Sequence, residues 1–208
     1  MLAAALLAQV SFDYSSVQRD MLMGISGNAE SLKRAMEACE KALAENPNHP
    51  AALVYHGIGL LFQSQGSPEA FPRAIAEMDH AVELDPDNLG VRIPRGSALM
   101  AVIRQMPDSP MRQSQMEKAR SDFQYAFDVQ KEHLDQLGAH PLGELLQNLG
   151  DIYSRLEKPE EAEKFYALIQ TKLPNSEYSE RAAKWMETKR PLPVRQTACV
   201  GCHTGARQ

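Results

Sequence analysis

The sequence predicts an all-α protein built from helical hairpins, and three observations lead to this fold class. Apolar residues recur at gaps of three and four along several stretches, which places them on one face of a helix. Residues that favour turns separate these stretches. Small residues and prolines also return at a constant step, because Gly57 lies 39 residues before Gly96 and Pro47 lies 39 residues before Pro86.

The clearest hairpin is predicted for residues 146–174, which read LQNLGDIYSRLEKPEEAEKFYALIQTKLP. Each of its two helices carries apolar and small residues on one face. These residues are Leu146, Leu149, Gly150 and Tyr153 in the first helix, and Ala162, Tyr166, Ile169 and Pro174 in the second. Lys158-Pro159 supplies the turn. Gly150 is therefore expected to face Ala162 across a close contact between the helices.

This pattern resembles a tetratricopeptide repeat, a helix–turn–helix unit with a period of about 34 residues. The resemblance implies a right-handed solenoid of about four helical hairpins, closed by a capping helix over its last apolar face. Residues 13–188 form this predicted repeat domain. Contacts between neighbouring hairpins would stabilise it, because one hairpin cannot bury its apolar face alone.

Residues 1–12 form an apolar N-terminal segment that begins MLAAALLAQV. This run matches the hydrophobic part of a secretion signal, with cleavage expected after Ala8. No Lys or Arg precedes it, and it is too short to span a membrane as a helix. The alternative is an apolar N-terminus that packs on the first helix.

The first hairpin is predicted from a short amphipathic helix over residues 13–23. Gly24 and Gly27 are expected to end this helix, and Ser31 is expected to begin the next one. Cys39 falls on the apolar face of that second helix, where a buried and reduced thiol is expected.

The second hairpin begins at Pro50 and continues after a polar insert at residues 63–72. His56 occupies an apolar position in its first helix, and a packed, hydrogen-bonded core histidine is expected there rather than a metal ligand.

The third hairpin carries two arginines at positions where apolar residues are expected. Pro94 predicts that the helix starts late, with Gly90–Ile93 extended and Arg92 at the surface. Arg95 directly precedes the close-packing Gly96, so a buried guanidinium paired with Asp85 or Glu83 is expected.

A longer connection over residues 131–141 leads to the fourth hairpin. After it, Tyr178, Ala182, Ala183 and Trp185 mark one more amphipathic helix. This helix is predicted to be the cap, with a polar outer side.

The resemblance further implies that the array binds a protein partner or a peptide in its concave groove. The groove would be lined by the first helix of each hairpin. Its expected positions include Ile58, Phe62, Ser97, Met100, Gln147, Asp151 and Arg155. This set is mixed in character and does not identify the ligand, and plain solvated side chains are the alternative.

Composition limits the other partners. The chain has 208 residues, of which 43% are hydrophobic and 24% charged, as in an ordinary soluble globular protein. A net charge of −5 gives no reason to expect nucleic acid. Three cysteines are too few for a disulfide scaffold.

Residues 189–208 form a proline-containing basic linker and a tail with different chemistry. Cys199, Cys202 and His203 form a C-x-x-C-H motif, which resembles the haem-attachment motif of c-type cytochromes. In that family the two thiols bind the vinyl groups of one haem c covalently, and the histidine ligates the iron. Cys199 and Cys202 are therefore the expected attachment residues and His203 the expected axial ligand.

Three other interpretations of the tail remain open. A zinc site needs a fourth ligand, and the tail offers no further Cys, His, Asp or Glu. A redox dithiol of thioredoxin type follows a strand, and no strand pattern precedes this motif. The third alternative is a tail without function.

The sequence thus predicts an extracytoplasmic, periplasmic bacterial scaffold that carries one haem for electron transfer and meets a redox partner. The alternative is a protein–protein interaction adaptor with an unstructured or metal-binding tail. No paired carboxylates, nucleophile elbow or phosphate loop indicate an enzyme, and no transmembrane helix is expected.

Overall fold

The computed structural model describes residues 12–63 and 70–193, and these residues form helices with no strand among them. They divide into two compact units, one ending at Pro86 and the other beginning at Asp87. The helices of the first unit are α1 (Tyr14–Ile25), α2 (Ala29–Glu45), α3 (Pro50–Gln63) and α4 (Ala70–Leu84). Those of the second are α5 (Leu89–Ile103), α6 (Pro110–Gln130), the 3-10 helix η1 (Lys131–Gln136), α7 (Ala139–Arg155), α8 (Pro159–Lys172) and α9 (Glu177–Thr188).

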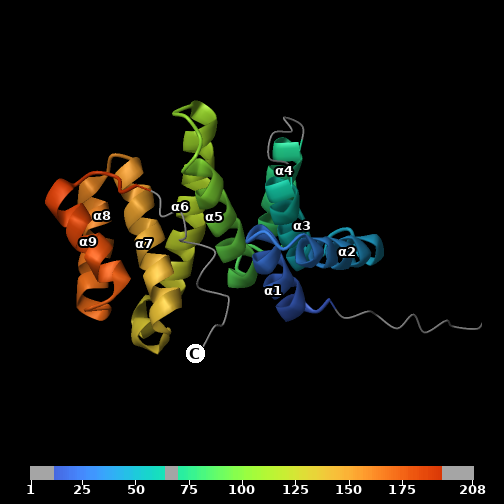
Figure 1. The fold of residues 1–208 in the computed structure, drawn as a ribbon, viewed down its shortest axis with the longest axis horizontal. Helices are drawn as coiled ribbons and strands as arrows, with labels where there is room; N and C mark the ends of the chain where they lie inside the picture. Colours follow the sequence, from blue (N-terminus) through green and yellow to red (C-terminus); the bar gives the residue numbers. More distant parts are fainter. Residues whose placement is uncertain (1–11, 64–69, 194–208) are drawn as a thin grey trace, which may run out of the picture. The chain divides into compact units, whose positions relative to one another are not determined.

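In the first unit, α1 packs on α2 and α3 packs on α4, so each consecutive pair is a hairpin (Figure 1). Helix α2 also packs on α3, which joins the two hairpins around one core. Gly57 allows the close approach of α3 and α4, because a Cβ atom there would lie 2.8 Å from the carbonyl oxygen of Ala74. The predicted first and second hairpins are confirmed.

His56 and Cys39 both lie in the core of the first unit. His56 is buried, and its Nδ1 lies 2.5 Å from Oε2 of Glu77. Glu77 also accepts a 3.0 Å hydrogen bond from Nε of Arg73. Cys39 is fully buried, and this burial, with the charges of Glu40 and Glu77, raises the pKa of its thiol to about 12. The predictions of a packed histidine and a buried thiol are confirmed.

The predicted helix boundaries in the first hairpin were wrong by a few residues. Gly24 lies inside α1, where an added Cβ would come within 2.6 Å of Cβ of Leu32. Gly27 makes the turn, with φ of +106°. Helix α2 begins at Ala29 rather than Ser31, because the side chain of Asn28 caps it by accepting the amide N–H of Ser31 at 3.0 Å.

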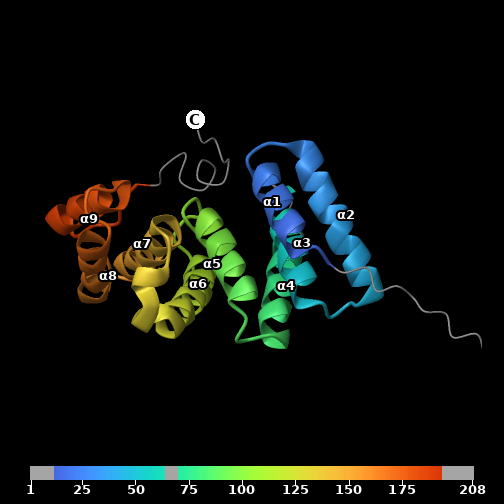
Figure 2. The same cartoon turned by 90° about the horizontal axis from the view of Figure 1, so that it is seen from below.

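In the second unit, α5 pairs with α6 and α7 pairs with α8 (Figure 2). Helix α6 also packs on α7, and α9 packs on α8. The turn before Pro159 lies where it was predicted, with Glu157 in the left-handed region at φ of 56°. All four predicted hairpins are therefore present in the described residues, and the all-α fold class is confirmed.

Gly150 does provide close packing between α7 and α8, but its expected neighbour was wrong. A Cβ atom at Gly150 would lie 2.8 Å from the ring of Tyr166, and the nearest atoms all belong to that ring. Tyr166 is fully buried. The missing side chain of Gly150 therefore makes room for an aromatic ring rather than for Ala162.

The start of the third hairpin also differs from the prediction. Helix α5 begins at Leu89, so Gly90–Ile93 are helical and Pro94 lies inside the helix. Asn88 fixes this start, because its side-chain oxygen accepts the amide N–H of Gly90 at 2.8 Å.

Arg95 is buried and paired, as predicted. Its Nε and Nη2 donate to the two carboxylate oxygens of Asp122 on α6, at 2.7 Å and 2.8 Å. The candidates from the sequence were Asp85 and Glu83, and Asp122 was not among them. Arg92 was wrongly placed at the surface, since its side chain is 14% exposed and donates to Asp122 at 3.0 Å while lying over the ring of Tyr125.

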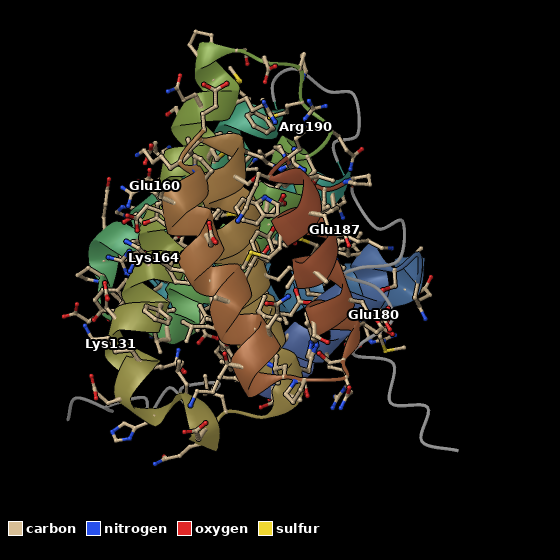
Figure 3. The ribbon with its side chains drawn as sticks, turned by 90° about the vertical axis from the view of Figure 1, so that its left-hand side faces the viewer. Lys131, Glu160, Lys164, Glu180, Glu187 and Arg190 are labelled. Atoms are coloured by element: carbon tan, nitrogen blue, oxygen red, sulfur yellow. The ribbon has the colours of Figure 1, made fainter. Side chains whose placement is uncertain are left out.

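Helix α9 is the cap that was predicted. The indole Nε1 of Trp185 donates to the hydroxyl of Ser154 on α7 at 2.7 Å, and its ring stacks on Tyr166 of α8 at 4.7 Å. The outer sides of α8 and α9 carry exposed charged side chains instead of apolar ones (Figure 3). Those labelled on these helices are Glu160, Lys164, Glu180 and Glu187.

Among the helices described, none combines the length and the apolar character that crossing a membrane requires. The predicted signal segment, residues 1–12, lies outside the described residues except for Phe12.

Candidate binding surface

Helix α7 carries a row of polar residues on one face. Gln147, Asp151 and Arg155 follow one another at steps of four residues, a spacing that aligns side chains along a helix. Gln147 and Asp151 are buried, and the Arg155 side chain is 12% exposed. So many nearly buried polar groups need partners, because an unpaired one costs free energy.

Asp151 is the acceptor that organises this row. Its Oδ1 accepts from Nε of Arg155 at 3.0 Å, and its Oδ2 accepts from Nε of Arg104 at 3.2 Å. Arg104 follows the last residue of α5 and also donates to Oδ1 of Asn148 at 3.1 Å. The network ties the end of α5 to the middle of α7 and fixes both guanidinium groups in place.

Gln147 stands apart from this network. Its side chain is buried, yet Oε1 has no hydrogen-bond partner within the described part of the chain. A buried carbonyl oxygen of this kind has been removed from water without compensation, which costs on the order of 1–3 kcal/mol. The Oε1 atom of Gln147 would gain a hydrogen bond only if its side chain turned outward to a donor.

Residues 190–193, here named the C-terminal strap, contact this surface. Helix α9 ends at Thr188, its C-cap residue Lys189 adopts the left-handed conformation (φ 51°), and the chain then turns back toward α7 (Figure 1). Arg155 Nη2 donates to the carbonyl oxygen of Leu192 at 3.1 Å, and Nη2 of Arg181 donates to that of Pro193 at 3.3 Å. Leu192 is only 9% exposed.

The sequence-predicted groove residues have mixed outcomes. Gln147, Asp151 and Arg155 share one surface on α7. Met100 on α5 and Ile58 on α3 are 1% and 4% exposed and lie in the core, and Gln147 and Asp151 on α7 are buried to a similar degree. Ser97 and Phe62 are partly exposed, and the latter belongs to the first unit together with Ile58.

Three residues of the surface were missed by sequence reasoning. Arg104 and Asn148 were not singled out, although Asn148 lies between two residues of the apolar face of its helix. Arg181 sits on the capping helix, which was expected only to cover its neighbours. No local pattern points to Arg104 or Arg181, because only the fold brings them from other elements to this surface.

Cys199, Cys202 and His203, the residues predicted to hold a haem, lie outside the described residues. Within the described ranges, no group of three or more His, Cys, Asp or Glu side chains is arranged to hold a metal ion. The arrangement at α7 is suited to binding polar groups, with two guanidinium donors, those of Arg104 and Arg155, anchored on Asp151.

A comparison with protein families agrees with the helical hairpin at this surface. A family model described as tetratricopeptide repeat matches residues 143–169, which cover most of α7 and α8. A crystal structure of a thermophilic tetratricopeptide repeat protein from Thermus thermophilus aligns over 82% of this chain and 99% of that chain, at 21% sequence identity and a TM-score of 0.40. A search of curated proteins finds no significant match.

Proposed function

We propose that this protein is a protein-binding scaffold whose second unit holds an extended polypeptide segment against α7. The observation that carries the proposal is the pair of hydrogen bonds from Arg155 and Arg181 to main-chain carbonyl oxygens of the strap. These donors bind backbone rather than side chain, as a site for an extended peptide requires. The tetratricopeptide repeat match to residues 143–169 supports a role in protein binding.

Gln147 adds the complementary group. An extended peptide presents N–H donors as well as carbonyl acceptors, and the Gln147 side chain would meet one of these N–H groups through a rotamer change that brings its buried Oε1 to the surface. Arg104 and Asp151 do not need to contact the peptide, because they hold Arg155 in position. A surface organised in this way before binding loses less entropy when the partner arrives.

Selection of random displayed peptides on the immobilised full-length protein tests this function. We expect enriched peptides whose binding falls when Arg155 is changed to Met or Gln147 to Leu. Val129→Asp serves as the control, because Val129 is 53% exposed on α6. The proposal would be contradicted if no peptides were enriched, or if peptide binding were unchanged by both substitutions at α7.

We further propose that the tail carries one covalently attached haem c and that the protein works outside the cytoplasm, in the periplasm. Cys199 and Cys202 would hold the haem through thioethers, and His203 would ligate its iron. The donor set fits this group, because two thiols three residues apart and an adjoining imidazole are what the attachment needs. The bound haem would supply one-electron transfer to a redox partner.

Expression with a secretion signal and the cytochrome c maturation system tests the haem proposal. Haem absorbance should remain with the protein after denaturation in acid and solvent, and Cys199→Ala together with Cys202→Ala should abolish it. His203→Ala should change the iron's ligation and reduction potential. Wild-type protein without covalently retained haem would favour the adaptor with an unstructured or metal-binding tail.

A further inference from the structure

The C-terminal strap has the features of a bound peptide more than those of a connecting loop. Leu192 is 9% exposed, whereas Pro191 and Pro193 on either side of it are exposed. One apolar side chain is therefore anchored between two prolines that point away. Because proline has no N–H and a fixed φ, the segment is held extended and presents mainly carbonyl oxygens.

The donors that meet these oxygens are already positioned. Arg155 donates to the strap through its Nη2 and to Asp151 through its Nε. One guanidinium group therefore bridges α7 and the strap. Asp151 is in turn fixed by Arg104. This chain of contacts keeps the Arg155 donor in place whether or not the strap is present.

We propose that the strap is an intramolecular ligand, and that the partner bound at α7 presents the same chemistry: an extended leucine between prolines. The proposal rests on the peptide-binding function above and names its ligand. In the free protein the strap occupies this binding site, beside Arg155 and Arg181. A partner segment of this kind takes their place, so partner binding and tail docking exclude each other.

The covalent connection sets the strength of this competition. Leu192 lies four residues beyond the end of α9, and so short a tether corresponds to an effective concentration in the millimolar range. A strap of modest intrinsic affinity then fills the binding site most of the time. The strap weakens the apparent affinity of a competing peptide by the ratio of this effective concentration to the strap's own Kd. If strap and peptide both bind with a Kd of about 0.1 mM, the ratio is about tenfold.

The test uses the full chain and a labelled synthetic peptide, KRPLPVRQ, which copies residues 189–196. Fluorescence anisotropy should show weak binding to the wild-type protein and about tenfold tighter binding to Leu192→Asp, whose own strap leaves the binding site. Arg155→Met, added to Leu192→Asp, should remove most of this gain. A peptide with aspartate in place of leucine should not bind either protein.

The controls separate the outcomes. Val129→Asp places the same charge at an exposed position of α6 and should bind the peptide as the wild type does. Leu192→Ala is the second release variant, used if Leu192→Asp fails to reach the helical content of the wild type. Equal peptide affinity for the wild-type and release variants would overturn the strap proposal. If displayed peptides without a leucine–proline element bind through Arg155, the scaffold function stands and the strap proposal fails alone.

Discussion

Asp122 is the residue on which the polar core of the second unit depends. It is fully buried and accepts hydrogen bonds from Arg95 and from Arg92, both on α5. Burial raises the pKa of its carboxyl group, and the two guanidinium groups oppose this shift. Because a buried carboxylate is costly without its counter-ions, the three residues act as one unit.

Arg95→Met tests this dependence. The substitution keeps much of the side-chain volume but leaves Asp122 with fewer donors. The free energy of unfolding should fall by roughly 3 kcal/mol, the low end for breaking a buried pair, since Arg92 remains. Urea unfolding measures the change, and Lys164→Met, which breaks an exposed pair with Glu161, should cost less than about 1 kcal/mol. An equal effect of the two substitutions would show that Arg95 is not the buried member.

The environment of Glu77 makes the free energy of unfolding of the first unit depend on pH in the acidic range. Burial by itself would raise the pKa of this carboxyl group, but hydrogen bonds from His56 and Arg73 outweigh it and hold the pKa below its usual value. A lowered pKa in the folded state stabilises the fold above the unfolded-state pKa, and this contribution disappears as the pH falls through the folded-state pKa. The effect therefore belongs to the range below about pH 4.5.

Glu77→Gln should remove this contribution. Between about pH 5 and pH 3, the urea midpoint of the wild type should fall more steeply than that of the variant, as followed by circular dichroism. Glu45→Gln, at an exposed position of α2, provides the control and should keep the wild-type slope. Parallel slopes for wild type and Glu77→Gln would mean that another group governs the acid transition.

At the scale of elements, the α7–α8 hairpin is defined by the contact between Gly150 and Tyr166. Gly150→Leu places a side chain where the tyrosine ring now lies, and such overpacking costs about 1–3 kcal/mol. Ala167→Leu introduces the same side chain at an exposed position of α8 and should leave the stability nearly unchanged. Thermal unfolding compares the two variants. A smaller loss for Gly150→Leu than for Ala167→Leu would exclude the close contact.

The sequence allowed the hairpins to be predicted because their signals are local. The spacing of Leu146, Leu149, Gly150 and Tyr153 reports one helix face without knowledge of any other element. The helix starts at Ala29 and Leu89 were missed, although Asn28 and Asn88 are residues that cap helices. Reading these asparagines as caps would have corrected both boundaries.

The partners across helices could not be predicted in the same way. Asp122 lies 27 residues from Arg95, and nothing in either helix alone fixes the register between α5 and α6. Leu192 has no periodic pattern around it, because prolines flank it on both sides. Its burial and its contact with Arg155 depend on the turn at Lys189, where a non-glycine residue adopts the left-handed conformation.

At the scale of the whole molecule, charge is distributed unevenly along the chain. Residues 189–208 contain four basic residues and no acidic one, so the 18 basic and 27 acidic residues of 1–188 give that part a net charge of −9. Opposite charge on the tail and on the rest of the chain favours docking of the strap, and salt screens this attraction.

Peptide binding should therefore weaken as salt is added. For the Leu192→Asp protein, the affinity for KRPLPVRQ should fall several-fold between about 0.05 and 0.5 M NaCl. A peptide with glutamine in place of its three basic residues should bind more weakly at low salt and respond little to added salt. Anisotropy titrations measure both peptides. A salt response that persists in the uncharged peptide would assign it to the arginines of α7 and α9 instead.

Trp185 makes the second unit optically distinct. It is the single tryptophan of the chain, and the ammonium group of Lys189 lies 4.8 Å from the centre of its ring. Fluorescence excited at the red edge of protein absorption therefore comes from one indole, which lies next to the start of the strap. Because a nearby cation shifts indole emission, the colour of this emission should change when Lys189 moves away. The emission wavelength of Trp185 could therefore follow the release of the strap over time without an added dye.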